Sequence, residues 1–392
     1  MPWKSTCALT ERTQFINECK EGVLSVAKLC RIYAISRKTG YKWLERYETE
    51  GVSGMQSRSS AAHVHRNAVT SEVEDWILRG RSLFPTWGPK KLVAWARRES
   101  GQKSLCAVST AGRILQREGL TVPRKCTRKS EPFPGILKPG SESNELWCVD
   151  FKGHFKVGDR SRCDPLTVTD ACSRYLLKCQ HLPHTGLIAT RRVFEAAFRQ
   201  YGLPQRIRSD NGSPFSSIGL GGFSVLSVWW IKLGITPERI EPGKPYQNGG
   251  HERMHLTLKK ETASPPAATL RAQQRRFDLF RKEFNEQRPH EALSQQTPAS
   301  LYCRSDREYT GRPQGPSYAE GMVTRKVQGN GVFGWDNENV FLGEAFAGER
   351  IGFAPAGDGL WEVRFAHVVL GTFEERKRLI RSKVAPRRRP RR

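Results

Sequence analysis

The sequence predicts a multidomain protein with all-α helix-turn-helix domains, an α/β catalytic core and a small C-terminal β-barrel. Three observations lead to this prediction. The chain has 392 residues, which is enough for two to four domains of about 100–200 residues each. Apolar residues recur at helical spacing up to about residue 120, and strand-like and helical runs alternate from 144 to 303. From Met322 to Glu374 short runs of strand character follow one another.

Residues 1–52 are predicted to form a helix-turn-helix domain. The run from Leu24 to Tyr33 has apolar residues at helical spacing, and Ser36 then stands where its hydroxyl can cap the next helix. In such domains the start of the second helix meets base edges in the major groove of DNA. The expected DNA contacts are therefore Arg37, Lys38, Thr39 and Lys42. An ordinary helical hairpin with solvated basic residues is the alternative.

A second helical unit follows a predicted linker. Residues 53–69 are rich in Gly, Ser and Ala and are predicted to form the linker. Residues 70–122 are predicted to form a second helix-turn-helix domain, in which Ser109 caps the third helix. A spacer bundle without DNA contacts is the alternative. Residues 123–143 combine prolines with many basic residues and predict an extended basic linker.

The predicted core at 144–303 contains the run of strands and helices that matters most. Strands are expected at 146–155, 165–171 and 174–181, then a helix from Leu187 to Tyr201 and a strand that ends at Asp210. This order predicts a mixed sheet with helices on its faces. The apolar run from 223 to 233 predicts a buried helix, and 266–293 a long basic one.

Three carboxylates in the core suggest a metal-dependent phosphoryl-transfer site. Asp150 lies in a short apolar strand, Asp210 precedes an Asn-Gly turn, and Glu252 opens a helix. Mg²⁺ prefers oxygen ligands. Two such ions, about 3.5–4 Å apart, can hold the attacking and leaving oxygens of a phosphodiester. Taken singly, each acid is more simply a solvated surface charge, and Asp170 is a rival for the first position.

The surroundings of Glu252 predict contacts with DNA and also offer a competing motif. Glu252, His255 and Lys259 have the spacing i, i+3, i+7 and share a helix face. We expect His255 and Lys259 to grip DNA beside the scissile phosphate. Further contacts are expected from the preceding loop, at Lys244, Tyr246, Gln247 and Asn248. The same stretch also fits H-E-x-x-H, the zinc metalloprotease pattern, at 251–255.

The whole arrangement resembles the catalytic core of insertion-sequence transposases and retroviral integrases, the DDE class. The matching residues are Asp150 in WCVDFKG, Asp210 in SDNG and Glu252 in PGKPYQNGGHERMH, followed by RPHEAL at 288–293. The resemblance implies an RNase H-like core, with Asp150, Asp210 and Glu252 as catalytic residues and metal ligands. It also implies two Mg²⁺ ions, which Mn²⁺ can replace, and a dimer or tetramer on double-stranded DNA that bridges terminal inverted repeats and target DNA. A catalytically inactive or domesticated DNA-binding regulator is the alternative.

The remaining features agree with a nucleic-acid partner. There are 65 basic and 39 acidic residues, a net charge of +26, which is usually neutralised by a polyanion. The ten cysteines form no CxxC pair, so we expect reduced thiols and no zinc module. No membrane span or secretion signal is predicted. Together with the resemblance to bacterial transposases, this implies a cytoplasmic, nucleoid-associated protein. Residues 304–320 read as a linker, 321–374 as a barrel, SH3-like by resemblance to integrases, and 375–392 as a disordered basic tail.

Overall fold

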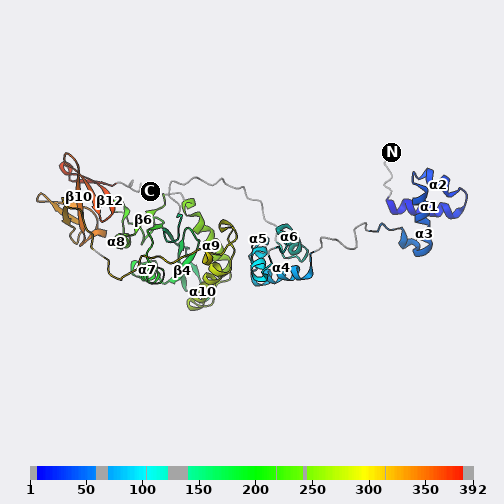
Figure 1. Ribbon diagram of the computed structural model, residues 1–392, viewed down its shortest axis with the longest axis horizontal. Coiled ribbons are helices and arrows are strands. Elements are labelled where there is room, and N and C mark those ends of the chain that lie inside the picture. The colour runs from blue at the N-terminus through cyan, green and yellow to red at the C-terminus, as the bar shows by residue number, and fades with distance from the viewer. Residues whose placement is uncertain are drawn as a thin grey trace. The chain divides into compact units, whose positions relative to one another are not determined.

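A computed structural model describes residues 7–58, 69–102, 104–121, 140–217, 219–241, 245–313 and 315–382 (Figure 1). The chain divides into two units, Met1–Val69 and Thr70–Arg392. Within the described ranges, none of the helices combines the length and the apolar character that crossing a bilayer requires.

The first unit is a three-helix domain with α1 (Ala8–Glu21), α2 (Val26–Ile32), α3 (Arg37–Glu50) and a closing 3₁₀ turn, η1 (Gly51–Met55). The predicted cap is confirmed, because the backbone N–H of Thr39 donates to Ser36 Oγ at 3.1 Å. Met55 is buried in the core of this domain beside Phe15 and Trp43. The predicted start of the linker at 53 is therefore wrong, since the domain continues through η1.

The second unit begins with α4 (Ser71–Leu83), α5 (Pro89–Ser100) and α6 (Val108–Arg117). The three helices bury Ile77, Leu92 and Leu115 among them. The predicted cap at Ser109 is wrong: Ala107 precedes α6, and no side chain caps this helix. Of the predicted linker at 123–143, residues 123–139 lie outside the described part of the chain.

A mixed sheet forms the core that follows. Its strands are β1 (Leu146–Phe151), β2 (Phe155–Lys156), β3 (Arg162–Asp170), β4 (Leu176–Leu182), β5 (Arg206–Ser209) and β6 (Thr236–Arg239). β2 and β4 both pair with β3, and β1, β5 and β6 follow in that order. β3 is antiparallel to β1, β2 and β4, whereas β5 is parallel to both β1 and β6. The predicted mixed sheet is confirmed, and β6 is a strand that the sequence did not predict.

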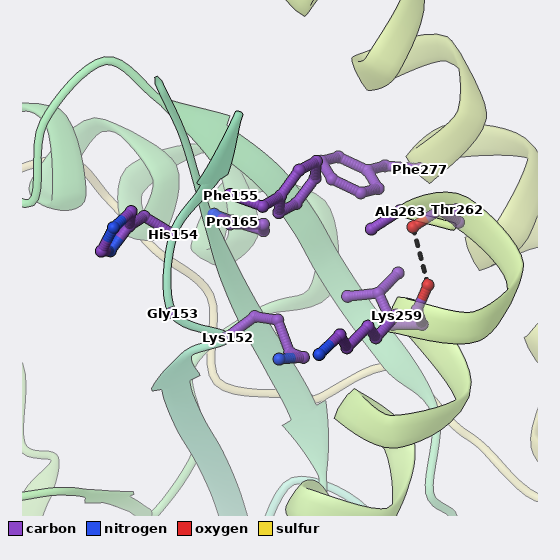
Figure 2. Close-up of a pocket in the computed structure, with 10 residues that line it drawn as sticks. Lys152, Gly153, His154, Phe155, Pro165, Lys259, Thr262, Ala263 and Phe277 are labelled. Carbon is purple, nitrogen blue, oxygen red and sulfur yellow. Dashed lines mark hydrogen bonds between the residues drawn. The ribbon is translucent and has the colours of Figure 1, made fainter. Parts of the chain in front are cut away.

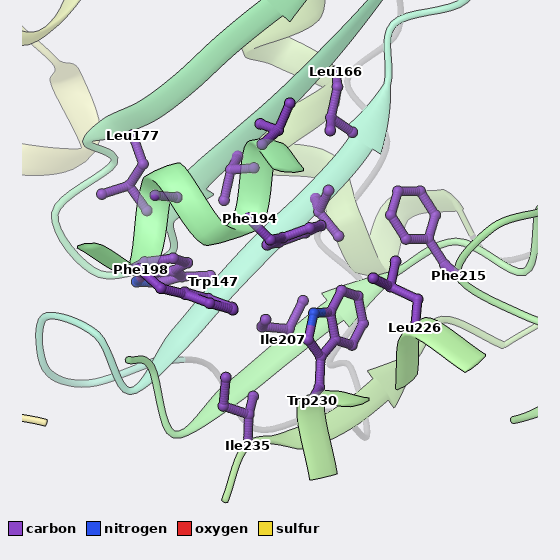
Figure 3. Packing of buried hydrophobic residues seen from close by; sticks show 14 of the residues in the cluster. Trp147, Leu166, Leu177, Phe194, Phe198, Ile207, Phe215, Leu226, Trp230 and Ile235 are labelled. Atoms are coloured by element: carbon purple, nitrogen blue, oxygen red, sulfur yellow. The ribbon is translucent and has the colours of Figure 1, made fainter. Parts of the chain in front are cut away.

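Helices cover both faces of this sheet. α7 (Leu187–Tyr201) and α8 (Val225–Lys232) pack on one face, where Trp147, Phe194 and Trp230 belong to one apolar cluster (Figure 3). On the other face, α9 (Gly249–Thr262) and α10 (Leu270–Glu286) contribute to a second cluster, which includes Leu258 and Phe277. Side chains alternate between the two faces along a strand. The strand residues that alternate with members of the first cluster therefore point toward α9.

α8 is apolar on nearly all sides because two cores enclose it. Its residues Trp229 and Trp230 belong to the cluster of the sheet, whereas Val228 and Ile231 belong to the cluster of the C-terminal domain. The prediction of a buried helix here is confirmed. The helix therefore joins the core domain to the C-terminal domain, and Lys232 adds an ion pair to Glu349 at 2.7 Å.

The C-terminal domain is made of β7 (Val323–Lys326), β8 (Val332–Trp335), β9 (Glu338–Phe341), β10 (Arg350–Gly357), β11 (Leu360–Phe365), β12 (Val368–Glu374) and β13 (Leu379–Ser382). The sheet β13-β12-β11-β10-β7 and the pair β8-β9 share one apolar cluster. β13 corrects the prediction of a disordered tail from 375, because it pairs with β12; residues 383–392 lie outside the described ranges. Closure into an SH3-like barrel stays a prediction.

The predicted linker at 304–320 is wrong in its first part, which is held on the core. Ser305 Oγ donates to the Leu203 carbonyl at 2.7 Å, and Arg307 Nη1 donates to the Pro204 carbonyl at 2.6 Å. These contacts bring the chain past the sheet before it reaches the C-terminal domain.

Candidate active site

Asp150 and Asp210 lie at the ends of two adjacent parallel strands. Cys148 of β1 pairs with Arg208 of β5. The same register, continued by two residues, sets Asp150 beside Asp210. The two carboxylates come from positions 60 residues apart in the chain (210 − 150 = 60), and the sheet alone makes them neighbours.

The charge around Asp150 is unbalanced. Burial raises the pKa of its carboxyl to about 7, and the negative charges of Asp210 and Glu252 add to this shift. The charge of Lys152 opposes it and is the smaller effect. The site therefore concentrates carboxylates in a partly buried place, where a cation would relieve their repulsion.

Asp210 begins the turn that follows β5. The backbone N–H of Gly212 donates to Asp210 Oδ1 at 3.1 Å. A Cβ atom at position 212 would lie 2.9 Å from Asp210 Oδ2, so glycine allows this close approach. The Asn-Gly turn predicted after Asp210 therefore holds the carboxylate at the edge of the sheet.

Glu252 lies in the first turn of α9 and is exposed to solvent. A Cβ atom at Gly250, one residue before His251, would lie 2.0 Å from Arg174 Nη1, so the start of the helix fits closely against that arginine. Among the described residues, no three His, Cys, Asp or Glu side chains lie close enough together to hold a metal ion. The expected gathering of all three carboxylates is therefore not met in this structure, although the charge of Glu252 acts on Asp150.

The two histidines of α9 are buried against β3. Thr167 Oγ1 lies 2.7 Å from Nε2 of His251 and 2.7 Å from Nε2 of His255, and Thr169 Oγ1 lies 2.9 Å from Nδ1 of His251. Both nitrogens of His251 thus have hydroxyl partners in the protein. The zinc-protease alternative is wrong for this reason, since neither nitrogen of that ring is available to a metal.

His255 lies beside Asp150 in the interior of the protein. Its side chain is buried, and Nδ1 lies 3.7 Å from Asp150 Oδ2. Burial lowers the pKa of His255 to about 3, with a further contribution from the charge of Lys152. The ring is therefore neutral near pH 7 and forms no ion pair with Asp150. Its burial does not fit the predicted contact with DNA, and we assign it to positioning α9 instead.

Asp170, the rival for the first carboxylate, has a structural role. Its side chain is fully buried at the end of β3. Oδ1 accepts the Asn144 N–H at 2.8 Å, and Oδ2 accepts the N–H and hydroxyl of Ser173 at 2.8 and 2.6 Å. With both oxygens engaged, Asp170 fixes the turn between β3 and β4.

The residues expected to contact DNA near the site differ in their exposure to solvent and in their hydrogen bonds. Lys259 is exposed on α9. The Gln247 side chain forms two hydrogen bonds with Glu241, each 2.8 Å, and Asn248 is buried. Lys244 and the side chain of Tyr246 lie outside what the structure describes. In the first unit, Arg37, Lys38 and Lys42 are exposed at the start of α3, and Thr39 is half-buried against its cap.

Three functional features escaped the sequence reasoning. Thr167 and Thr169 alternate with apolar Leu166 and Val168 along β3, a period-two pattern that could have placed both hydroxyls on the face of α9. Lys152, two residues after Asp150, is the third. No local pattern distinguishes it from other lysines of the chain.

Family models match most of the described chain. Residues 140–245 and 233–298 match models of the integrase core domain, 11–62 match a helix-turn-helix domain, and 39–115 match a homeodomain-like domain. A protein of the insertion element IS407 from Burkholderia multivorans is 31% identical over 198 residues, covering 49% of this chain and 68% of that relative. The chain belongs to the DDE transposases of insertion sequences.

Other similar proteins match this transposase over shorter parts or at lower identity. A protein of the insertion element IS476 from Xanthomonas euvesicatoria is 30% identical over 169 residues, covering 42% of the transposase but only 46% of that relative. Among solved structures, the HTLV-2 integrase catalytic core domain in complex with magnesium has 17% sequence identity and a TM-score of 0.34, covering 42% of the transposase and 99% of that chain.

Proposed function

We propose that this transposase binds the terminal inverted repeats of its element and catalyses cleavage and strand transfer of DNA with Asp150, Asp210 and Glu252. One observation carries the proposal: the register of β1 and β5 makes Asp150 and Asp210 neighbours. The helix α9, which packs on the same sheet, carries Glu252 in its first turn. The exposed basic residues of α3 would bind the repeats. A homo-oligomer in the cytoplasm would bridge two ends.

The donor set fits two Mg²⁺ ions in its chemistry, and Mn²⁺ as a replacement. All three side chains offer oxygen, which hard divalent cations prefer. Burial, together with the charges of Asp210 and Glu252, raises the pKa of Asp150. Asp150 and Asp210 would hold the ions from the sheet, and the exposed Glu252 would approach from α9. Bound ions would stabilise the charge on the attacking and leaving oxygens.

The reaction exchanges one phosphorus–oxygen bond for another in each of two steps. In the first, a water oxygen bonds to the phosphorus at the element end, the bond to the 3′ oxygen breaks, and a 3′ hydroxyl is released. In the second, that 3′ oxygen bonds to a phosphorus of target DNA and displaces a target 3′ oxygen. Both steps leave the protein unmodified, so its residues only bind, orient and stabilise.

The test compares charge-removing variants in a strand-transfer assay with Mg²⁺ and with EDTA. Asp150→Asn, Asp210→Asn and Glu252→Gln should each abolish strand transfer and leave binding of the terminal repeats unchanged. Glu286→Gln, on the exposed side of α10, is the matched control and should keep full activity. Undiminished strand transfer in any of the first three variants would remove that residue from the site. Repeat binding by the unmodified chain without Mg²⁺-dependent nicking would favour a DNA-binding regulator.

A further inference from the structure

A pocket of about 130 Å³ lies next to the proposed catalytic residues, between the loop that follows β1 and the helices α9 and α10. Lys152 and Lys259 line it, as do the rings of Phe155 and Phe277. Figure 2 shows the two lysine side chains reaching toward each other, with the two rings at the other end of the pocket. The pocket thus has a cationic end and an aromatic end.

The cationic end brings two ammonium groups together, and of the described carboxylates only the charge of Asp150 acts on Lys152 against the repulsion from Lys259. In the described part of the chain, neither lysine ammonium group has an ion pair or a hydrogen bond. Lys152 is half-buried, whereas Lys259 is exposed. Two like charges that face each other at the edge of a protein repel, and a bound anion turns this repulsion into attraction.

The aromatic end is preformed. The Phe155 and Phe277 rings meet edge to face, with centroids 6.4 Å apart and an interplanar angle of 89°. Phe277 is fully buried in the core, which fixes its ring, and Phe155 is half-buried on the short strand β2. A flat aromatic group could pack on the open side of Phe155 without disturbing the core.

We propose that this pocket receives one unstacked nucleotide of the DNA strand, with its phosphate between Lys152 and Lys259 and its base against Phe155. The inference rests on the proposed function in one respect, because DNA must reach Asp150. A pocket of about 130 Å³ admits a single flat group and excludes a duplex. Stacking on an aromatic ring accepts any base, so the pocket would hold the strand without reading its sequence.

The position of the pocket suggests what it does for the reaction. Lys152 follows Asp150 by two residues, and Lys259 lies about two helical turns beyond Glu252 on α9. A nucleotide held there would draw its strand out of the duplex beside the carboxylates. The pocket would then fix which phosphate along the strand faces Asp150.

Photocrosslinking of the full chain tests this proposal. The probe is a duplex oligonucleotide with a 3′ overhang that carries 5-iodo-deoxyuridine, irradiated in EDTA, and the crosslinked peptide is identified by mass spectrometry. The crosslink should map to the segment that contains Phe155. Phe155→Leu and Lys152→Ala should each reduce it at least about fivefold, which is the effect of losing about 1 kcal/mol of stacking or phosphate binding. Lys260→Ala, which removes the same charge from an exposed neighbour on α9, should change it less than about twofold.

A competition arm separates a nucleotide from a bare phosphate. An unlabelled oligonucleotide with an intact overhang should compete at least about fivefold better than one whose overhang is abasic. Equal competition, a crosslink outside the pocket, or equal losses in Lys152→Ala and Lys260→Ala would each overturn the proposal. If Phe155→Leu fails to fold by circular dichroism, the lysine pair decides. Because the assay contains no divalent cation, crosslinking in a chain that transfers no strands would refute the proposed function and keep the pocket.

Discussion

Thr167→Val removes the hydroxyl on which the packing of α9 depends. Thr167 Oγ1 lies 2.7 Å from Nε2 of His251, 2.7 Å from Nε2 of His255 and 3.1 Å from the Asp150 carbonyl oxygen. A hydroxyl donates one hydrogen bond and accepts two. All three contacts are satisfied if Thr167 donates to the carbonyl and accepts from the N–H of each ring. We therefore infer that both histidines are neutral and protonated at Nε2.

The magnitude follows from the two ring N–H groups that valine would leave without partners. His251 is 3% exposed and His255 is 7% exposed, so water cannot replace the hydroxyl at either ring without entering the core. Each unsatisfied buried group costs about 1–3 kcal/mol. We expect Thr167→Val to lower the free energy of unfolding by about 2–6 kcal/mol and the Tm by at least about 4 °C.

Thr190→Val is the matched control, because the same substitution removes a hydroxyl that has no partner. Thr190 is fully buried in α7, and its Oγ1 forms no hydrogen bond with any residue that the structure describes. This variant should be neutral or more stable than the unmodified chain. Thr167→Ser should keep most of the stability, because it retains the hydroxyl. Scanning calorimetry measures all three, and equal Tm values for Thr167→Val and Thr190→Val would refute the assigned network.

Three further predictions concern other parts of the chain. Ser36→Ala should destabilise the first unit by about 1 kcal/mol, and Ser25→Ala, whose hydroxyl makes no cap bond to α2, should not; hydrogen exchange in α3 measures both. Burial lowers the pKa of His290 to about 3, so the stability from its neutral ring is full above pH 6.5 and falls as the pH drops toward 3. Between pH 7 and pH 5 the free energy of unfolding of the unmodified chain should fall by about 2 kcal/mol more than that of His290→Leu. The control His184→Leu, at an exposed position, should show the same fall as the unmodified chain, and urea unfolding at both pH values measures all three. The logarithm of the binding constant for the terminal repeats should fall with the logarithm of the salt concentration, with a slope of about −0.9 per phosphate contacted. Arg37→Ala should reduce the magnitude of that slope by about one if its contact is to phosphate. An unchanged slope and affinity would remove this arginine from the interface.

The sequence predicted the elements whose ends carry strong local signals. α7 begins and ends at the predicted residues, because Gly186 and Gly202 flank an amphipathic run. β5 ends at Ser209, one residue before the end at Asp210 that the Asn-Gly turn indicated. β6 was missed because Thr236–Arg239 contains no alternation of apolar and polar residues, and all four of its side chains are half-buried. The strand exists because β5 offers a parallel partner, which no local pattern reveals.

The candidate site was predictable in its members and not in its geometry. The sequence placed Asp150 within a strand and Asp210 at the end of another, and the register of β1 and β5 makes the two carboxylates neighbours. The position of Glu252 depends on how α9 is rotated about its own axis. That rotation is set by contacts with β3, which are distant in sequence and invisible to motif spacing.

The rotation of α9 also limits how Glu252 can join the other two carboxylates. Successive side chains of an α-helix are about 100° apart, so with His251 and His255 turned toward Thr167 and Thr169, Glu252 lies on the flank of the helix and is exposed. Rotating the helix to bring Glu252 over Asp150 would break the hydrogen bonds of both histidines, at about 1–3 kcal/mol for each buried group left unpaired. A change of rotamer at Glu252 breaks none of these bonds. If Glu252 acts as proposed, its carboxylate therefore reaches the site by side-chain rotation over a fixed helix, and loosening α9 by Thr167→Val should weaken strand transfer without weakening repeat binding.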